Sequence, residues 1–518
     1  MSKKRVVIIG AGPAGLTAAY ELIMRAGDFY EVLIMEAGDR VGGLAQNYLH
    51  RDKVFDPGAH IFNCQSEQVK SWVGSFSPLQ GQPAYDELIT QSINTLQKYG
   101  ADPQIYDNTM LMRPNAFASF YKGKGVSLPL ELSLENIQKL GIKNYALLAH
   151  DMAKMLFANE RINSLESKLS KRFGESSYSQ FYEGYFEKHF GIHPAELPAN
   201  INAFPLDVKR DYPNPLELAK NLISKQKNKA QLPTFLYHKY GSGYFWNIVA
   251  REIASKGGKI FLNCPVKSIF FNGRRASRII CEPKGTETEV EADVFLSSLP
   301  LPDLIRRAEG ISVPQALIEI AESLPYRSYV SVGLELRSWR FTEGKEAPIY
   351  PGAFMGNKKL PYARKVLLPQ KGCRISEVQI FNNISPYLYA RPHETIWMGV
   401  GMPCSNGENL WKQSDDALIK QSISELEMLG IINGRDVLDS CIQRIEQAFP
   451  GYGGSYPYLD RLRTYLDEFS NLFCIGCAGQ HYYGGMDAAI LSSIEAVSNI
   501  ITGKKERNEI WRSTASRL

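Results

Sequence analysis

The chain has 518 residues, of which 44% are hydrophobic and 22% are charged, and its formal net charge is +5. This length exceeds a single hydrophobic core, so we expect a globular protein with two or three structural units. The small positive excess is spread along the chain without a long basic run, which gives no support to nucleic-acid binding.

The first element predicts a dinucleotide site. An apolar run at residues 6–9 leads into Gly10-Ala11-Gly12-Pro13-Ala14-Gly15 and then into an amphipathic helix. In such a strand–loop–helix unit, Gly10 makes the tight turn, Gly12 lets the backbone approach a pyrophosphate, and Gly15 lets the helix pack close to the strand. A second strand, residues 31–35, ends at Glu36, which follows Gly15 by 21 residues and can accept a hydrogen bond from a ribose 2′-OH.

The next seven residues, Ala37-Gly38-Asp39-Arg40-Val41-Gly42-Gly43, indicate which dinucleotide. Paired glycines let the chain run along a long, flat cofactor, and Arg40 can meet its phosphates. The stretch resembles the Asp-Arg-x-Gly-Gly signature of flavoproteins in the amine oxidase, protoporphyrinogen oxidase and phytoene desaturase superfamily. The resemblance implies FAD, whereas a glycine turn in an NAD-binding sheet is the alternative.

The middle of the chain predicts alternating cofactor and substrate stretches. Helical spacing at residues 135–158 and 179–191 indicates a helical insertion rather than another sheet. The cofactor domain then resumes with a helix that starts within residues 237–246 and runs to Ile253, a strand at 259–262 and a buried strand at 292–300. In the superfamily the adenine is bound through the backbone of a valine, which corresponds to Val266 by resemblance.

The last part of the chain predicts a return to the cofactor. A mixed region that includes a strand at residues 329–336 suits the floor of a substrate cavity. A strand at 471–476 ends in Gly476, and a Gly/Tyr-rich turn precedes a small-residue helix that begins Met486-Asp487-Ala488. The positive end of that helix dipole would stabilise negative charge on a reduced flavin. A surface strand–helix connection is the alternative.

Three blocks together resemble protoporphyrinogen-oxidase-like flavoproteins and the UDP-galactopyranose mutases that share their fold. They are Gly42-Gly43-Leu44-Ala45 with residues 55–62, Tyr240-Gly241-Ser242-Gly243, and residues 476–497. Leu44 stands where amine oxidases usually have arginine, which is closer to the mutases. Gly58-Ala59-His60 replaces the Gly-Gly-His of the mutases, and only Asp487 remains of their terminal Asn-Gln-Asp-His motif.

The resemblance implies an α/β fold with a Rossmann-like FAD-binding domain, an interleaved α+β substrate domain and a helical insertion. We expect the FAD-binding domain in three parts, residues 1–91, 231–305 and 441–518. The helical insertion would occupy residues 92–230, and the substrate domain residues 306–440. The cofactor would contact Gly10, Gly12, Pro13, Ala14, Gly15, Glu36, Ala37, Arg40, Gly42, Gly43, Leu44, His60, Val266, Gly476, Met486, Asp487 and Ala488.

Four residues are candidates for the chemistry. His60 follows the Gly58-Ala59 turn and can donate, accept or relay a proton near neutral pH, or else it forms a wall of the cofactor site. Tyr482 and Tyr483 would line the cavity or fill a domain junction. Arg327 begins a substrate-domain strand where the mutases bring positive charge to a nucleotide diphosphate, although an exposed arginine is ordinarily solvated. Asn382 and Asn383 could bind a polar substrate.

Three functions remain open. The first is an FAD oxidoreductase that takes a hydride from an amine, a porphyrinogen or a ring to be desaturated. The second is a sugar-nucleotide mutase that uses reduced FAD, and the third is a non-catalytic carrier such as the Rab escort proteins, which resemble this fold. The intact glycine fingerprint and Glu36 argue against the carrier.

We expect a small-molecule substrate and no metal. The eight scattered cysteines, including Cys474-Ile475-Gly476-Cys477, are interpreted as buried thiols of a cytoplasmic protein. No apolar stretch reaches the ~18 residues of a spanning helix, while peripheral membrane contact stays open. The terminal Ser516-Arg517-Leu518 resembles a peroxisomal address. The sequence predicts no oligomeric state.

Overall fold

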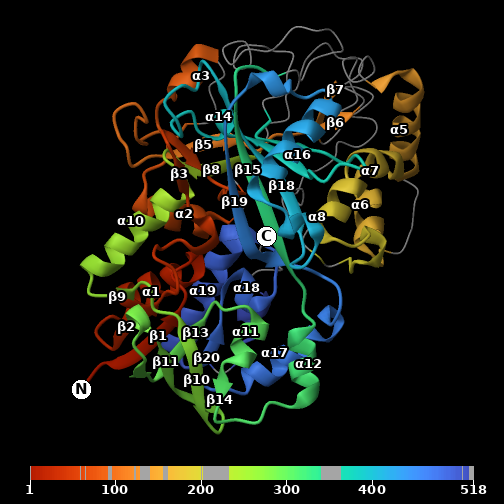
Figure 1. Ribbon diagram of the computed structural model, residues 1–518. Helices are drawn as coiled ribbons and strands as arrows, with labels where there is room; N and C mark the ends of the chain where they lie inside the picture. Colours follow the sequence, from red (N-terminus) through yellow and green to blue (C-terminus); the bar gives the residue numbers. More distant parts are fainter. Residues whose placement is uncertain are drawn as a thin grey trace.

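The computed structural model describes residues 2–58, 60–64, 66–90, 96–121, 124–128, 140–155, 162–199, 201, 233–339, 363–504 and 506–512. A parallel sheet lies in the lower half of the molecule and a larger mixed sheet in the upper half, with helix α19 (Gly485–Thr502) between them (Figure 1). The expected α/β fold with a Rossmann-like domain is confirmed.

The lower sheet is built from segments of both ends and the middle of the chain. All its neighbouring strands are parallel. In sheet order they are β20 (Leu472–Cys474), β13 (Val294–Ser297), β1 (Lys4–Ile9), β2 (Tyr30–Met35) and β9 (Lys259–Phe261). The strands expected at residues 6–9, 31–35, 259–262, 292–300 and 471–476 are therefore confirmed, with small differences at their ends.

Alternate residues of β1 and β2 enter two different cores, because successive side chains of a strand point to opposite faces. Val6, Ile8 and Ile34 face a core shared with helices, whereas Val7 and Leu33 face a second core. Both faces of the sheet are covered, which explains why its strands are continuous apolar runs.

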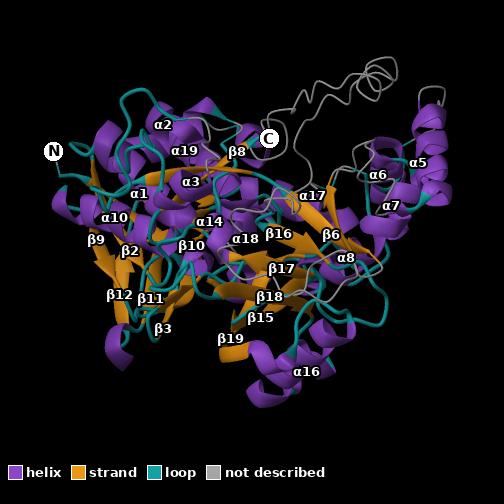
Figure 2. Ribbon diagram, turned by 90° about the horizontal axis from the view of Figure 1, so that it is seen from above, coloured by secondary structure: helices purple, strands orange, loops and turns teal. Residues whose placement is uncertain are grey.

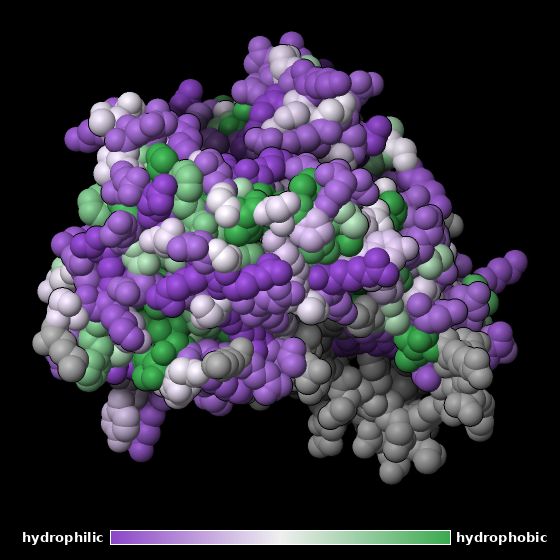
Figure 3. Space-filling model, turned by 90° about the horizontal axis from the view of Figure 1, so that it is seen from below, coloured by the Kyte–Doolittle hydropathy of each residue, from purple (hydrophilic) through white to green (hydrophobic). Residues whose placement is uncertain are grey.

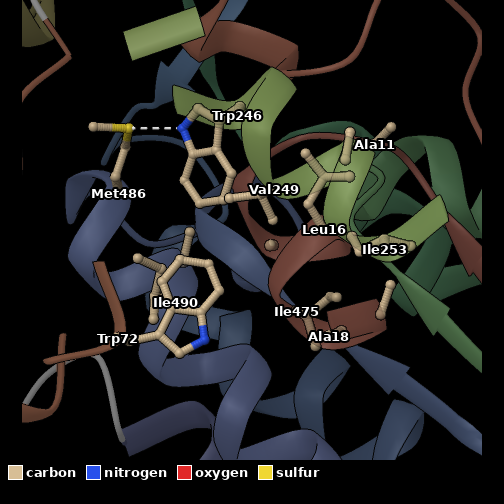
Figure 4. Packing of buried hydrophobic residues seen from close by; sticks show 14 of the residues in the cluster. Ala11, Leu16, Ala18, Trp72, Trp246, Val249, Ile253, Ile475, Met486 and Ile490 are labelled. Carbon is tan, nitrogen blue, oxygen red and sulfur yellow. Dashed lines mark hydrogen bonds between the residues drawn. The ribbon is translucent and has the colours of Figure 1, made fainter. Parts of the chain in front are cut away.

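The helices of the first core are α1 (Pro13–Ala26), α2 (Glu67–Phe76), α10 (Ser242–Ser255) and α19. Figure 4 shows Trp246 of α10 directed at the first turn of α19, where its Nε1 donates to Met486 Sδ at 3.3 Å. Trp72 and Ile490 pack in the same core. This core joins the N-terminal fingerprint to the C-terminal helix.

The second core lies between the parallel sheet and a smaller, mostly antiparallel sheet. Three helices, α11 (Leu301–Arg306), α12 (Gln315–Glu322) and α17 (Leu459–Asp467), contribute to it. The strands in sheet order are β12 (Thr288–Glu291), β11 (Arg275–Cys281), β10 (Val266–Asn272) and β14 (Ala308–Glu309).

The upper sheet has seven strands and is antiparallel except where β16 pairs with β6. Helix α16 (Asp415–Met428), next to the short α15 (Asn409–Lys412), packs on one face (Figure 2). The strands in sheet order are β19 (Val437–Pro450), β15 (Tyr326–Leu336), β18 (Ile396–Cys404), β17 (Glu377–Ile380), β16 (Lys365–Leu367), β6 (Phe117–Tyr121) and β7 (Lys124–Leu128).

The region expected to be a helical insertion is only partly helical. Its described residues form four helices, α5 (Ile142–Met155), α6 (Leu165–Phe173), α7 (Glu175–Phe181) and α8 (Glu183–Phe190). The expectation of no sheet is wrong, because β5 (Met110–Pro114), β6 and β7 lie in the same region. Apolar side chains of β6 and β7 pack against α6–α8, so strand and helix here stabilise each other. Residues 135–139, 156–158 and 202–230 lie outside the described residues.

Two further expectations differ from the structure. Residues 237 and 238 end a strand, β8 (Thr234–His238), and the helix begins only at Ser242 because β8 pairs with β5. The expected boundary between residues 440 and 441 falls inside β19, which pairs with β15 along its length. Another hydrophobic core packs β8 and the hairpin of β3 (Tyr48–His50) and β4 (Lys53–Phe55) against Trp397 of β18 in the upper sheet.

The remaining helices are short: α3 (Tyr85–Thr90), α14 (Phe381–Ile384), α18 (Gly476–Gln480) and α20 (Asn508–Arg512). Among the described residues, no helix has the length and apolar character to cross a membrane. On the face seen from below, apolar side chains form small groups among hydrophilic ones (Figure 3).

Candidate active site

The glycine loop after β1 brings two backbone segments into contact. Gly10 has φ +101°, and a Cβ there would lie 2.2 Å from Ser298 Oγ. A Cβ on Gly15 would lie 1.9 Å from the Gly10 carbonyl oxygen. A Cβ on Gly43 would lie 3.0 Å from Gly12 Cα, whereas a Cβ on Gly12 would meet only Gly43 Cα, at 3.7 Å. Gly10, Gly15 and Gly43 are therefore required by the fold itself, and Gly12 leaves open space above the loop.

The N-terminus of α1 fits a pyrophosphate. Its N-cap, Gly12, provides no side-chain cap, Pro13 follows, and the first turn carries no acidic residue. The positive end of the helix dipole and the first-turn N–H groups are thus left for an external anion. Glu36 accepts hydrogen bonds from the N–H groups of Ala11 at 2.6 Å and Gly38 at 2.8 Å. These bonds fix its carboxylate beside the loop, where the ribose is expected.

Three other residues that are predicted to contact the cofactor, Arg40, Leu44 and Val266, make contacts that do not by themselves indicate a ligand. Arg40 donates to the Asn47 carbonyl at 3.2 Å and lies over the Tyr48 ring, so its contacts are in the following turn. Leu44 is 41% exposed. Val266 begins β10, two residues after Cys264, whose N–H donates to the Glu36 carbonyl. Val266, the predicted adenine contact, thus lies near Glu36, the predicted ribose contact.

The C-terminal block is held against α1. Gly476 has φ +74°, and a Cβ there would lie 2.7 Å from the Ala14 Cβ. Its N–H donates to Ser492 Oγ at 3.0 Å, and Ser493 Oγ donates to the Ala14 carbonyl at 2.9 Å. The first turn of α19, with Met486, Asp487 and Ala488, also lacks a side-chain cap. The two ends of the chain therefore pack against each other, where the sequence predicts a single cofactor site.

Asp487 connects α19 to the loop after His60. Its carboxylate accepts hydrogen bonds from the N–H groups of Asn63 at 3.2 Å and Cys64 at 2.8 Å. Burial raises the pKa of this carboxyl to about 6, although the two N–H groups oppose the shift. Asp487 thus positions the 63–64 turn rather than standing free in the site.

His60 is held by a fully buried carboxylate. Asp56 Oδ1 lies 2.8 Å from His60 Nδ1, and Asp56 Oδ2 accepts the His60 backbone N–H at 3.2 Å. Tyr237 and Ser242 donate to the same carboxylate at 2.8 and 2.9 Å. Because Asp56 Oδ1 accepts a hydrogen bond from the Nδ1–H of His60, Nε2 is the atom of the neutral ring that can accept a proton. The Ala59 between them lies outside the described residues.

The segment from Asp56 to Cys64 is fixed at both ends by elements that are predicted to bind the cofactor. Ser242 Oγ lies 3.0 Å from the Ala45 carbonyl, next to Gly43, as well as bonding Asp56. At the other end Asp487 of α19 holds Asn63 and Cys64. His60 therefore lies on a loop between the glycine loop and α19.

A polar cluster lies where α8, the upper sheet and the 481–484 loop meet. Glu377 accepts hydrogen bonds from Lys365 at 2.7 Å, Tyr329 at 2.9 Å and Tyr185 at 3.2 Å. Burial opposes its ionisation, but Lys365 lowers the pKa of Glu377 to about 2. We call these residues, with Arg364, His189, Gln379 and Tyr483, the junction cluster.

Tyr483 is the predicted tyrosine that lies in the junction cluster. Its ring packs against His189 and Phe449, with centroids 5.2 and 5.3 Å apart. Burial raises the pKa of Tyr483, and the nearby Glu377 raises it further while Arg364 opposes this. Tyr482 lies beside Gly484, and its N–H donates to the Cys477 carbonyl. Tyr483 thus packs into the junction between α8 and β19, and its predicted role as a wall of the substrate cavity stays a prediction.

The structure gives Arg327 and the two asparagines other partners. Arg327 is buried, and its guanidinium contacts Ser405, Glu408 at 3.2 Å and the Lys188 carbonyl at 3.2 Å. Asn382 donates to Tyr389, and Asn383 donates to the Ala363 carbonyl. These contacts hold the upper sheet and its loops together.

Sequence reasoning missed three groups. Asp56 lay in a quoted block, and its spacing of four residues from His60 was the available signal. Arg364 and Asn115 carry no motif and meet only through long-range packing. All eight cysteines are free thiols, as expected, although only five of them are buried, whereas Cys64, Cys441 and Cys477 are half-buried. Burial raises the pKa of Cys474 to about 12 and of Cys477 to about 11. No metal-ligand cluster occurs within the described ranges.

Comparisons with known proteins show the family and the fold of this chain. The model of a family described as "Flavin containing amine oxidoreductase" matches residues 13–501. A protein of Klebsiella pneumoniae described as a probable UDP-galactopyranose mutase is 26% identical over 212 residues, 39% of this chain and 44% of that protein. The chain therefore matches less than half the length of this curated relative.

Two solved structures show the same fold. A reduced UDP-galactopyranose mutase superposes with a TM-score of 0.71 at 17% identity, over 99% of this chain and 97% of that one. A putrescine oxidase bound to putrescine superposes with a TM-score of 0.56 at 14% identity, over 97% and 99% of the two chains.

Proposed function

Because the chain belongs to the family of flavin-containing amine oxidoreductases, we propose that it is an FAD-dependent oxidoreductase that removes a hydride from a small organic substrate. The substrate would be of the amine, porphyrinogen or ring-desaturation type. The observation that carries this proposal is the Asp56–His60 pair, on a loop fixed between the two cofactor-binding elements. Bound FAD would supply the hydride acceptor.

His60 would act as the general base. Nε2 of the neutral ring would take the proton from a substrate N–H or O–H as the neighbouring C–H bond gives up its hydride. The substrate thereby loses two electrons and two hydrogens, one as a proton on His60. Asp56 would stabilise the imidazolium that forms and would keep the ring oriented.

The junction cluster supports a cavity that orients the substrate and excludes water. Tyr185, His189, Phe449 and Tyr483 pack ring against ring where α8 and the upper sheet meet the 481–484 loop. Aromatic walls hold a flat or apolar substrate at low conformational cost. Glu377 is held by the cluster itself and is not a free base.

The test is an anaerobic titration of the holoenzyme with a panel of amines and porphyrinogens. Bleaching of the visible flavin absorption, with recovery in air or on adding another electron acceptor, is the expected result. His60→Ala should bleach much more slowly while it keeps its bound flavin. Absence of bleaching with every class of donor, in a protein that holds FAD, would contradict the proposal.

A sugar-nucleotide mutase is the second candidate. It is supported by the 26% identity to the Klebsiella pneumoniae protein over 212 residues, and by His60 and Asp487, which match mutase motifs in part. Dithionite-reduced protein that converts a UDP-sugar without consuming a donor would favour this function over the oxidoreductase.

A further inference from the structure

Arg364 is a buried cation without a carboxylate partner among the described residues. It directly precedes β16 and is 2% exposed. Its Nε donates to Asn115 Oδ1 at 2.7 Å, and its guanidinium lies 4.6 and 5.3 Å from the ring centroids of Phe117 and Phe235. A buried guanidinium normally has an anionic partner, because burying an unpaired charge is costly.

The carboxylate nearest in the junction cluster does not fill this role. Glu377 already accepts from Lys365, Tyr329, Tyr185 and Gln379. Burial lowers the pKa of His189 to about 3, so this ring is neutral. The junction cluster therefore holds two positive charges, on Arg364 and Lys365, and one negative charge, on Glu377, which leaves one positive charge in excess.

Other buried polar atoms in the junction cluster also lack a hydrogen-bond partner among the described residues. Neither ring nitrogen of His189 has a hydrogen-bond partner in the part of the chain that the structure describes, and neither does Gln379 Oε1. Orphaned buried polar atoms are rare in folded proteins, and several in one place indicate a missing ligand.

Arg364 is linked to the cofactor-facing helix through two asparagines. Asn115 Nδ2 donates to Asn63 Oδ1 at 3.3 Å, and the Asn63 N–H donates to Asp487 in the first turn of α19. Asn63 also follows His60 by three residues. A short chain of hydrogen bonds therefore joins Arg364 to the loop that carries His60 and to the first turn of α19.

We propose that Arg364 anchors an anionic oxygen group of the substrate, a carboxylate or a phosphate, beside the junction cluster. The inference rests on the proposed function and adds the substrate class. A guanidinium offers paired N–H donors that match either group. The single excess charge suits a substrate with one such group, and Phe117 and Phe235 hold the guanidinium plane in place.

The test compares three probes of similar size, benzoate, phenyl phosphate and benzamide, by calorimetric titration of the FAD-loaded protein. At least one of the two anions should bind tenfold or more tightly than neutral benzamide, and which one does so identifies the group. Arg364→Gln should abolish this preference. Arg374→Gln, which changes an exposed arginine after β16, should retain it.

Asn115→Asp provides a second variant if Arg364→Gln fails to fold. It places a carboxylate beside Arg364 without changing side-chain size, and so it should also remove the anion preference. Benzamide binding as tightly as both anions, or an anion preference that survives in Arg364→Gln or Asn115→Asp, would overturn the proposal. If neutral amines bleach the flavin but the protein shows no preference for anions, the role of Arg364 is contradicted and the oxidoreductase function stands. If the protein prefers anions but no donor bleaches the flavin, the oxidoreductase function is contradicted instead.

Discussion

Asp56 Oδ1 lies 2.8 Å from Nδ1 of His60, and the same carboxylate accepts hydrogen bonds from Tyr237 and Ser242. The carboxylate thus has no exposed surface, and its acceptor positions are occupied. It fixes both the direction of the His60 ring and the nitrogen that carries the proton.

Asp56→Asn should lower kcat/KM by about 10²-fold, within the range that general acid–base catalysis contributes. An amide cannot stabilise the imidazolium, and it can present an N–H to Nδ1 and so reverse the tautomer. Steady-state kinetics of the flavin-loaded variant measure this effect. His193→Ala, which changes a half-exposed histidine paired with Glu183, is the control and should match the wild type. A kcat/KM of Asp56→Asn equal to that of the control would argue against a catalytic His60.

Gly12→Ala should weaken FAD binding at least about tenfold with little loss of stability. The new Cβ would make only an ordinary contact at 3.7 Å with Gly43 Cα, but it would occupy the space that the pyrophosphate needs. The ratio of flavin to protein absorbance after gel filtration, with thermal unfolding of the apoprotein, measures both effects. Gly74→Ala, on α2 with open space around its Cβ position, should keep its flavin. Equal flavin content in the two variants would contradict the predicted pyrophosphate site at Gly12.

Asp487 should make the free energy of unfolding depend on pH between about 4 and 6. Burial raises the pKa of this carboxyl to about 6, above its ordinary value of 3.8. In that window the folded state holds a proton that the unfolded chain has lost, so stability falls as pH rises. The contribution is fully present below about pH 4 and is lost by about pH 6, with a size of about 3 kcal/mol.

Denaturant unfolding of the wild type and Asp487→Asn across this window measures the effect, with FAD in excess. The difference in unfolding free energy between the two proteins should shift in favour of Asp487→Asn as pH rises from 4 to 6. Parallel pH profiles would show that the carboxyl titrates normally.

Lys53→Met should destabilise the protein by about 1–3 kcal/mol, because it removes the buried cation that Glu335 and Asp439 share. Among the described residues, the two carboxylates then keep only the more exposed ion-pair partners Arg391, Arg51 and His50. The Lys53 ammonium lies 3.1 Å from both Glu335 and Asp439, and its side chain is 2% exposed. These ion pairs join the β3–β4 hairpin to the upper sheet. Thermal unfolding measures the loss, and Lys371→Met, at a 73% exposed side chain, serves as the control. The double variant Lys53→Met/Glu335→Gln should recover part of the loss, and a melting temperature unchanged in Lys53→Met would contradict the role of this cluster.

The cofactor half of the fold could be predicted because its rules are local. The apolar runs at residues 6–9 and 31–35, the spacing of Gly10, Gly12 and Gly15, and the small-residue helix after Gly485 each fix a backbone shape within a few residues. Strands β6 and β7 were missed because the surrounding residues have helical spacing, and pairing with β16 decides their conformation.

Local sequence patterns are enough to predict the Rossmann-like FAD-binding domain, because glycine loops and buried parallel strands depend on neighbouring residues. Which side chains meet at the site depends on the packing of elements that are far apart in the sequence. Asp56 contacts Tyr237 and Ser242, which lie 181 and 186 residues away in the sequence, and Arg364 contacts Asn115, which lies 249 residues away. Such contacts depend on how distant elements pack and on which buried charges remain unpaired, and neither is encoded in a local pattern.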